Sequence, residues 1–359
     1  MRTHCLTAGI TLTALLFTGT AFSADPRLLN LVMPDATTMA GANVTNAEIT
    51  PFGQYVLAQM TASMDQQLQT FVTATGFDPR KDVSEILAAS AAGQTAGSAT
   101  TPGGLLLALG NFPVSQITAA ITAKAPDLAI QTYGGATLVA STNPKSGFSI
   151  AFLGSSIAVA GDMASVKGAI DRSAGVNSVN PALATQVQAL STNEDAWAVT
   201  NSSASALIPG LTTAPAATGT GTTPSPAAGI SQMLSGIVGS SGGVKFGTTV
   251  VFTGQAIAKD AATATSLANI LQALASIMSM AGGQDPQVTA MAQVLQGLKV
   301  TADGATINVA LSIPETQLET VLNGLKNPAP KPAAKPAVRP ARSPSADPGS
   351  RGAVASKGN

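Results

Sequence analysis

Two short clusters carry side chains that could do chemistry. Glu194 and Asp195 precede the only tryptophan, Trp197. Two carboxylates beside an aromatic ring are typical of enzymes that cleave glycosidic bonds, in which the acids face each other about 5 to 9.5 Å apart. Neighbouring residues of a strand point to opposite faces, so Glu194 and Asp195 are not expected to share a site. We expect a loop acid pair ahead of a buried tryptophan.

A serine–lysine pair is the other catalyst that needs no histidine. A single residue separates Ser165 from Lys167, whereas the Ser-x-x-Lys arrangement has two between them. We therefore expect Lys167 on a solvated helix face. The run 239–243 lacks the Lys-Ser/Thr ending of a phosphate loop and is expected to form turns. No stretch alternates Asp and Asn as a calcium loop does. We therefore predict no catalytic, cofactor-binding or metal-binding residues, and no enzyme.

The scarcity of histidine and cysteine supports this expectation. The sequence has one histidine, His4, and one cysteine, Cys5. Both lie in an N-terminal segment that we expect to be removed. The processed chain would then have no Ser/His/Asp or Cys/His triad, no His or Cys metal site, no thiolate redox centre and no disulfide.

The N-terminal segment has the order of a secretory signal peptide. Arg2 comes first, an uncharged run follows from Leu6 to Phe17, and small residues stand at Ala21 and Ser23. Cleavage is expected after Ser23, with cleavage after Ala24 as the alternative. The run is far shorter than the ~20 residues that span a bilayer. We expect an exported protein of the periplasm or the extracellular space that does not span a membrane.

The charge is divided unevenly along the chain. The formal net charge is zero, yet ten basic residues face seventeen acidic ones between positions 25 and 325. The Pro/Ala-rich tail 326–359 has one acidic residue and seven basic ones: Lys326, Lys331, Lys335, Arg339, Arg342, Arg351 and Lys357. With almost no large apolar residue, this tail is expected to be disordered. Lys331, Lys335, Arg339 and Arg342 are candidates for contact with an anionic envelope surface.

Caps and apolar periodicity predict six helices. They are expected to begin at Pro51 behind Thr50, at Pro113 and behind Asp162, to cover 267–278 and 288–298, and to follow the capping-box-like run 312–315. The helix that begins at Pro51 should place Phe52, Val56 and Met60 on one face and continue to Gly76. The uncharged helix over 267–278 has a polar side, so we expect it in a core and not in a membrane.

Short apolar runs between the helices predict strands. They cover 105–109, 129–133, 137–140, 148–153, 157–160, 196–200, 244–253, 255–259 and 306–313. Turns at Gly134-Gly135, Gly154-Ser155 and Asp303-Gly304 join several of them as hairpins, which indicates mainly antiparallel sheets.

The pattern of strand, turn, strand and helix occurs twice, over 148–170 and 298–325. We predict an α+β fold with helices packed on one face of the sheets and two similar units, 24–175 and 176–325, followed by the disordered tail. The stretches 88–104 and 210–229 are too poor in large side chains to form a core and are expected to be surface loops.

Three segments resemble a known family. The run 75–87 (TGFDPRKDVSEIL), the strand 104–109 and the run 157–162 entering a helix are similar to a family of exported bacterial proteins with a domain of unknown function. The resemblance covers mainly 33–172 and implies repeated α+β units and an envelope setting. It implies no catalytic residue. The second half has no matching Gly-Phe-Asp-Pro turn. From the residues themselves, Asp82 and Glu85 are expected in a short helical turn.

Three functions are compatible with these residues. The first is an exported, non-catalytic envelope protein with a binding or structural role and no nucleic-acid partner. The alternative is a carrier of an apolar ligand or lipid between sheet and helices, with Met278, Met291 and Leu295 among the side chains that could line a cavity. A hydrolase that works through carboxylates such as Glu194 is the third.

Overall fold

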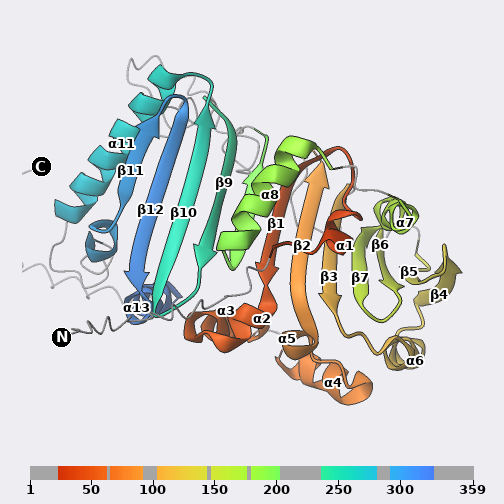
Figure 1. Ribbon diagram of the computed structural model, residues 1–359. Helices are drawn as coiled ribbons and strands as arrows, with labels where there is room; N and C mark the ends of the chain where they lie inside the picture. The colour runs from red at the N-terminus through yellow and green to blue at the C-terminus, as the bar shows by residue number, and fades with distance from the viewer. Residues whose placement is uncertain are drawn as a thin grey trace, which may run out of the picture.

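A single antiparallel sheet runs through the whole protein (Figure 1). The computed structural model describes residues 23–62, 65–91, 103–143, 147–175, 179–202, 236–280 and 292–326. Within this part of the chain, twelve strands pair in the order β11-β12-β10-β9-β8-β1-β2-β3-β7-β6-β5-β4. The α+β class with antiparallel strands is therefore confirmed.

The strands have the following bounds. They are β1 (Ala36–Asn43), β2 (Val83–Ala91), β3 (Gly104–Gly110), β4 (Leu128–Tyr133), β5 (Ala136–Ser141), β6 (Phe148–Leu153), β7 (Ile157–Asp162), β8 (Ala196–Thr200), β9 (Ile237–Lys245), β10 (Thr249–Ala258), β11 (Lys299–Asp303) and β12 (Thr306–Pro314).

Helices connect and cover the strands. They are α1 (Pro26–Leu29), α2 (Val44–Ile49), α3 (Pro51–Thr61), α4 (Asp65–Thr75), α5 (Pro79–Asp82), α6 (Val114–Lys124), α7 (Met163–Arg172), α8 (Pro181–Asn193), α11 (Ala261–Met280) and α13 (Glu315–Lys326).

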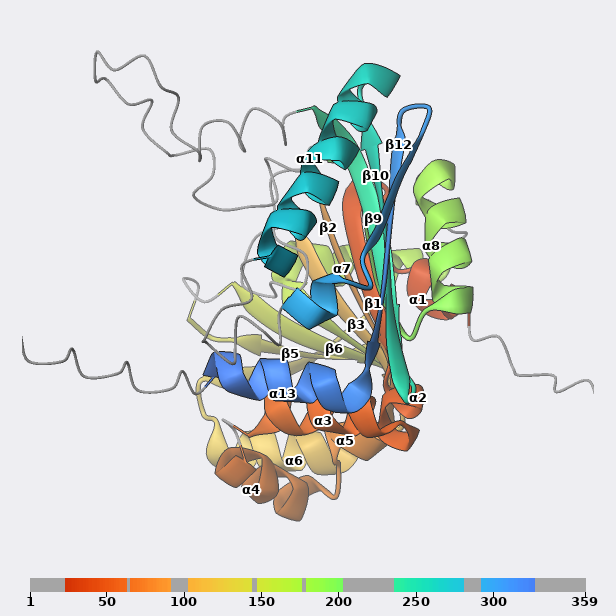
Figure 2. The ribbon, with the colours of Figure 1, turned by 90° about the vertical axis from the view of Figure 1, so that its left-hand side faces the viewer.

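Helices cover both faces of the sheet, so the expected packing on one face is wrong. On one face, α1, α7 and α8 enclose a core that contains Leu87, Leu107 and Trp197. On the other face, α4 and α6 pack over Ile86 and Ala108, while α3, α11 and α13 pack over β10 and β12. Figure 2 shows α11 and α13 on the opposite side of the sheet from α8. The physical reason is that the central strands are apolar at successive positions and not only at alternate ones.

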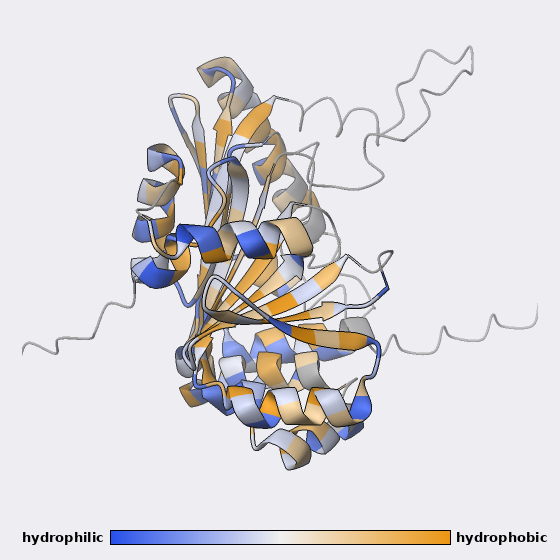
Figure 3. Ribbon diagram, turned by 90° about the vertical axis from the view of Figure 1, so that its right-hand side faces the viewer, coloured by the Kyte–Doolittle hydropathy of each residue, from blue (hydrophilic) through white to orange (hydrophobic). Residues whose placement is uncertain are grey.

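The hydropathy colours follow the same division. In Figure 3 the strands are largely hydrophobic, while the helices that cover them show hydrophilic residues on their outer sides. The face of β10 and β12 opposite α11 differs, since it presents Thr253, Gln255, Asn308 and Ser312. The amide of Gln255 donates to Asn308 Oδ1 at 3.1 Å on this polar surface.

Local caps explain where the helices begin. Pro51 is the first residue of α3, as expected, and Pro113 is the cap residue just before α6. The prediction that the helix from Pro51 continues to Gly76 is wrong, because α3 ends at Thr61 and the separate helix α4 covers 65–75. Asp162 caps α7 by accepting from the backbone N–H groups of Ala164 and Ser165, both at 3.0 Å. On α3, Phe52 is buried as predicted, but Met60 is exposed.

The predicted hairpin turns are confirmed. Glycines with positive φ stand at Gly134 and Gly135 between β4 and β5, at Gly154 between β6 and β7, and at Gly304 between β11 and β12. A left-handed backbone costs glycine little, which is why the turns fall at these residues.

Four local predictions are wrong. The run 244–253 is not one strand, because the chain turns at 246–248 between β9 and β10. The run 239–243 lies inside β9 and forms no turn. Glu85 belongs to β2, and the helical turn lies earlier, at α5, capped by Asp78. Residues 88–91 continue β2, where they pair with β1 and β3, and are not loop. Residues 92–102 of the first predicted loop and all of the second, 210–229, lie outside the described residues.

The two halves share a strand order but differ in their helices. The meander β1-β2-β3 is followed in the sheet by β7-β6, and the meander β8-β9-β10 by β12-β11. However, α7 packs on the face that carries α8, whereas α13 packs on the opposite face. The prediction of two similar units is therefore not confirmed, and β1 pairs directly with β8 across the expected boundary.

The uncharged helix α11 packs on the sheet, but its predicted place in a core is only partly right, because Ile270, Leu271 and Ile277 are exposed and Gln272 faces β11. Ala264, Leu267 and Ala268 are buried against β9, β11 and β12. Of the helices described, none is both long and apolar enough to cross a membrane.

Leu107 at the centre of the sheet should dominate the stability of the first core. Its side chain has 0% exposure, and Leu107→Ala is expected to lower the free energy of unfolding by about 2–5 kcal/mol, because it removes buried methyl groups and leaves a cavity. Leu271→Ala, at 39% exposure on α11, makes the same chemical change and should cost less than about 1 kcal/mol. Urea unfolding followed by Trp197 fluorescence measures both, and similar losses for the two variants would contradict this picture.

Candidate functional site

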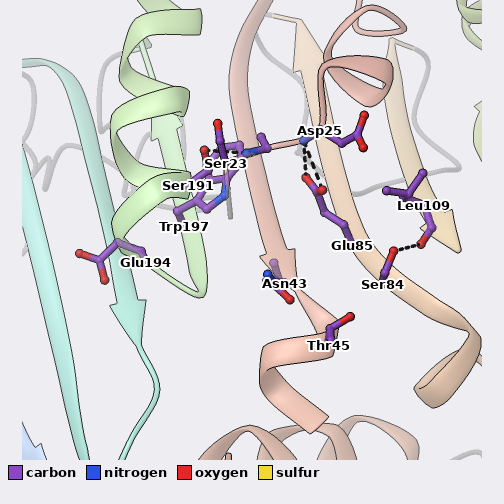
Figure 4. Close-up of a pocket in the computed structure, with 12 residues that line it drawn as sticks. Ser23, Asp25, Asn43, Thr45, Ser84, Glu85, Leu109, Ser191, Glu194 and Trp197 are labelled. Carbon is purple, nitrogen blue, oxygen red and sulfur yellow. Dashed lines mark hydrogen bonds between the residues drawn. The ribbon is translucent and has the colours of Figure 1, made fainter. Parts of the chain in front are cut away.

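A hollow lies near the centre of the sheet, on the face covered by α1 and α8. It has a volume of about 260 Å³. The residues that line it come from the N-terminal segment, from β1, β2, β3 and β8, from α2, and from α8 and the residue after it: Ser23, Ala24, Asp25, Ala42, Asn43, Thr45, Ser84, Glu85, Leu109, Ser191, Glu194 and Trp197. Figure 4 shows how they lie.

The N-terminal segment is fixed in this pocket by two backbone groups (Figure 4). The N–H of Ala24 donates to Ser191 Oγ at 2.9 Å. The N–H of Asp25 donates to both carboxylate oxygens of Glu85, each at 3.2 Å. Asp25 also caps α1 and pairs with Arg27 at 2.8 Å. The segment thereby links α8 to β2.

Glu85 is the one pocket residue with a strongly altered acidity. Burial raises the pKa of Glu85 to about 7, and the negative charge of Asp25 adds to this effect. The N–H of Asp25 and the charge of Arg27 oppose it. A carboxyl group with such a pKa could hold or release a proton near neutral pH.

Trp197 forms the apolar wall of the pocket and depends on a glycine beneath it. Trp197 pairs with Gly41 across β8 and β1. A Cβ atom at position 41 would lie 2.5 Å from Cζ2 of the indole, so a side chain there would displace the ring. The prediction that Trp197 is buried is confirmed, at 6% exposure.

Glu194 and Asp195 lie in the connection between α8 and β8, as the prediction of a loop acid pair has it, and their carboxylates have different partners. Glu194 accepts from the hydroxyl of Thr253 at 2.7 Å. Figure 4 shows its carboxylate directed away from Glu85. Asp195 is 3% exposed. It accepts from the backbone N–H of Phe246 at 2.6 Å and pairs with Lys245 at 3.2 Å.

Asp195 thus fastens β8 to the turn between β9 and β10, and the amide of Asn46 also donates to it. The two acids do not face each other across a common space, which glycosidic cleavage would require.

Ser165 and Lys167 form no catalytic pair. Ser165 Oγ donates to Asp162 Oδ2 at 2.5 Å, and the ammonium of Lys167 lies over the ring of Tyr133 at 5.0 Å from its centroid. Ser165 thus belongs to the cap of α7, whereas Lys167 is half-buried against Tyr133 and is not on the solvated face that was predicted for it.

Several predicted residues are not brought to a site. Lys331, Lys335, Arg339 and Arg342 lie outside the described residues, as do Met291 and the side chain of Met278. Leu295 is half-buried and lines none of the hollows described here. Among the described residues, no group of three or more His, Cys, Asp or Glu side chains could hold a metal ion.

Glu194 and Trp197, which line the pocket, are singled out by their residue types, but Glu85 and Ser191 are not. Glu85 was expected in a helical turn, and Ser191 belongs to α8, a helix not predicted. One signal was available for α8, because Asn180-Pro181 is a cap followed by apolar residues at Leu183 and Val187.

A second, apolar hollow lies between α4 and α6. It has a volume of about 270 Å³, and Lys124 is its one charged lining residue. The others are Thr70, Phe71, Ala74, Ala120, Ile121 and Ala125. Phe71 and Ile121 also pack against the core of this face.

Comparisons with known proteins show only a distant likeness. Two crystal structures of TP0453, in crystal forms III and IV, are similar to this chain with TM-scores of 0.49 and 0.46. Both alignments have 10% sequence identity and cover 84% of this chain, and 99% and 97% of the respective TP0453 chains. No protein-family model and no curated protein sequence matches the chain.

The raised pKa of Glu85 predicts that the stability of the fold depends on pH. This prediction is for a chain in which Ala24 is joined to Ser23 by a peptide bond. The folded carboxyl group keeps its proton up to about pH 7, whereas the unfolded one loses it near 4.5. The folded state therefore binds more protons between these values, and stability falls as the pH rises through them. Glu85→Gln should remove this fall, leaving stability near that of the parent at pH 5 and above it at pH 8.

Thermal unfolding at pH 5 and pH 8 measures this effect. The protein used carries a short polar extension before Ser23, so that no leader peptidase cleaves it. Glu319→Gln on α13 is the matched control and should keep the slope of the parent. A slope that survives Glu85→Gln would assign the pH dependence to other groups.

Proposed function

We propose that this protein is an exported, non-catalytic protein of the cell envelope that acts in the periplasm or outside the cell through binding or a structural role. Support for export comes from the N-terminal signal pattern. Support for a non-catalytic role comes from the site geometry and from the lack of histidine and cysteine after the expected cleavage.

The observation that carries this proposal is that the two pocket carboxylates, Glu85 and Glu194, bind different partners. Glu85 accepts from the backbone of Asp25, while Glu194 turns to Thr253. Acid–base hydrolysis needs two carboxyl groups directed at one bond. If the protein were a hydrolase of this kind, Glu194→Gln would abolish the activity. The present geometry instead uses these groups to join segments of the chain.

The charge distribution supports contact with an anionic partner. The acidic part 25–325 repels anionic surfaces, whereas the basic tail attracts them. Carboxylates of the cell wall, acidic glycans and anionic lipid headgroups share the chemistry that such a tail would recognise. Interactions of exposed charges are screened by salt, so the contact should be weak and salt-dependent.

Replacing Lys331, Lys335, Arg339 and Arg342 together by glutamine should therefore reduce binding to envelope fractions at low salt by at least about tenfold. The estimate follows from roughly 1 kcal/mol for each basic residue near an anionic surface, discounted for flexibility. Co-sedimentation at low salt and at about 0.5 M salt measures it.

The matched control keeps the charge by replacing the two lysines with arginine and leaving Arg339 and Arg342 unchanged. It should bind like the parent. Equal binding of the glutamine variant and the control would remove the tail from the proposed function.

The hollow between α4 and α6 favours the alternative of an apolar-ligand carrier. Its lining is almost wholly apolar, and it borders the core through Phe71 and Ile121. Lys124 could meet an anionic headgroup at the rim. Concave apolar sites with few polar groups are the usual form of small-molecule sites.

Filling this hollow tests the carrier role. Ala120→Trp should displace a bound lipid, so that native mass spectrometry of protein from its own host shows ligand on the parent and none on the variant. Ala119→Trp is the control, since Ala119 lies on the same helix but does not line the hollow. A ligand-free mass for the parent would reject the carrier role.

A further inference from the structure

The pocket around Glu85 lies where the chain passes from an exposed residue to a buried one. Ser23 is exposed, whereas Ala24 is 4% exposed and belongs to the same core as Leu28 and Val32. The segment that begins at Ala24 is therefore an integral part of the fold.

The backbone nitrogen of Ala24 lies close to two acceptors. It is 2.9 Å from Ser191 Oγ, and the next nitrogen, that of Asp25, is 3.2 Å from both oxygens of Glu85. Successive backbone nitrogens are at most ~3.7 Å apart, so the nitrogen of Ala24 is within about 7 Å of the carboxylate.

The sequence places the expected leader cleavage at this same bond. Hydrolysis of the Ser23–Ala24 peptide by a leader peptidase consumes one water molecule. Ser23 leaves with a carboxylate on the released segment, and Ala24 keeps the amine. An α-amine has a pKa of about 7.7–8.0 and takes up a proton at neutral pH.

We propose that cleavage between Ser23 and Ala24 creates an α-ammonium group that this pocket binds through Ser191 and the Glu85 carboxylate. The inference rests on the export part of the proposed function, but not on what the protein binds. Processing would thus place a positive charge within about 7 Å of the Glu85 carboxylate, an attraction that the uncleaved chain lacks, and would make the processed chain the more stable form.

The charges around Glu85 are consistent with this role. Asp25 and Glu194 are acidic, and Arg27, whose charge acts on Glu85, is bound to Asp25 at 2.8 Å. An ammonium on Ala24 would face the carboxylate from the side of α8, and it would lower the pKa of Glu85 from its raised value.

The proposal predicts that the effect of Glu85→Gln on stability changes sign when the chain is processed. In the chain with residue 24 in an amide bond, Glu85→Gln removes a buried carboxylate without a close cation and is stabilising at pH 8. In the processed chain the same substitution leaves a buried ammonium without its counterion and is destabilising at pH 7, where the amine is protonated.

The first measurement is the intact mass of the full-length protein after export. A mass that begins at Ala24 supports the cleavage. An uncleaved chain would remove the export part of the proposed function together with this inference, and a chain beginning at Asp25 would overturn the role of the Ala24 amine alone.

The second measurement does not depend on export. A chain whose fusion partner is cut to leave a free amine on Ala24 is compared at pH 7 with the same chain acetylated at that amine, each with Glu85 and with Glu85→Gln. The free amine should raise the Tm by about 2–4 °C when Glu85 is present and should not raise it after Glu85→Gln. Glu319→Gln should leave the 2–4 °C difference between the free and the acetylated amine in place. If this variant also abolished the difference, the effect would not be specific to Glu85.

Acylation of the α-amine gives a readout that does not require stable variants. At pH 7 the amine should react at least tenfold more slowly in the parent than in Glu85→Gln or Ser191→Ala. Equal acylation rates, or a Tm difference that does not depend on Glu85, would overturn the proposal.

Discussion

The antiparallel pairing of β1 with β8 is the constraint on which the rest of the molecule depends. Five residue pairs, from Thr38 with Thr200 to Ala42 with Ala196, join the two halves of the sheet. A hydrogen bond of 2.9 Å between the hydroxyls of Thr38 and Thr200 reinforces this junction. The pocket lies over the junction because Ala42 and Trp197 come from the two strands that meet there.

Elements with a strong local signal could be predicted from the sequence, and elements that depend on distant partners could not. Asp162, Pro51 and the Gly134-Gly135 turn act through atoms within a few residues, so their effect is visible locally. β1 has the sequence ATTMAGAN, without large alternating apolar residues. It is a strand through its pairing with β2 and β8, which are distant in the sequence, and that relation is not local.

The turn between β9 and β10 was missed for a related reason. Val244, Phe246 and the residues 249–253 have side chains typical of one strand. They give no local sign of the turn at 246–248. In the structure the N–H of Phe246 donates to Asp195, a residue 51 positions earlier in the chain. The candidate site is equally non-local, because Asp25, Glu85 and Ser191 come together only after the sheet has set its register.

The same use of acidic side chains recurs at three places in the protein. Glu85 accepts from the backbone of Asp25, 60 positions away, and Asp195 from that of Phe246. Asp162 accepts from the N–H of Gly103, 59 positions away, at 3.0 Å. Each bond joins segments that are distant in sequence, where a charged acceptor makes a stronger hydrogen bond than a neutral one.

A carboxylate that accepts from a fixed backbone N–H group is held in one orientation by it. Charged residues make up only 10% of the chain, and these three acids act as clamps between segments. Their positions follow from where the chain must be closed, at the start of the fold, at the β9–β10 turn and beside β3. Each of these acids therefore joins two distant segments of the chain, and its place follows from that connection.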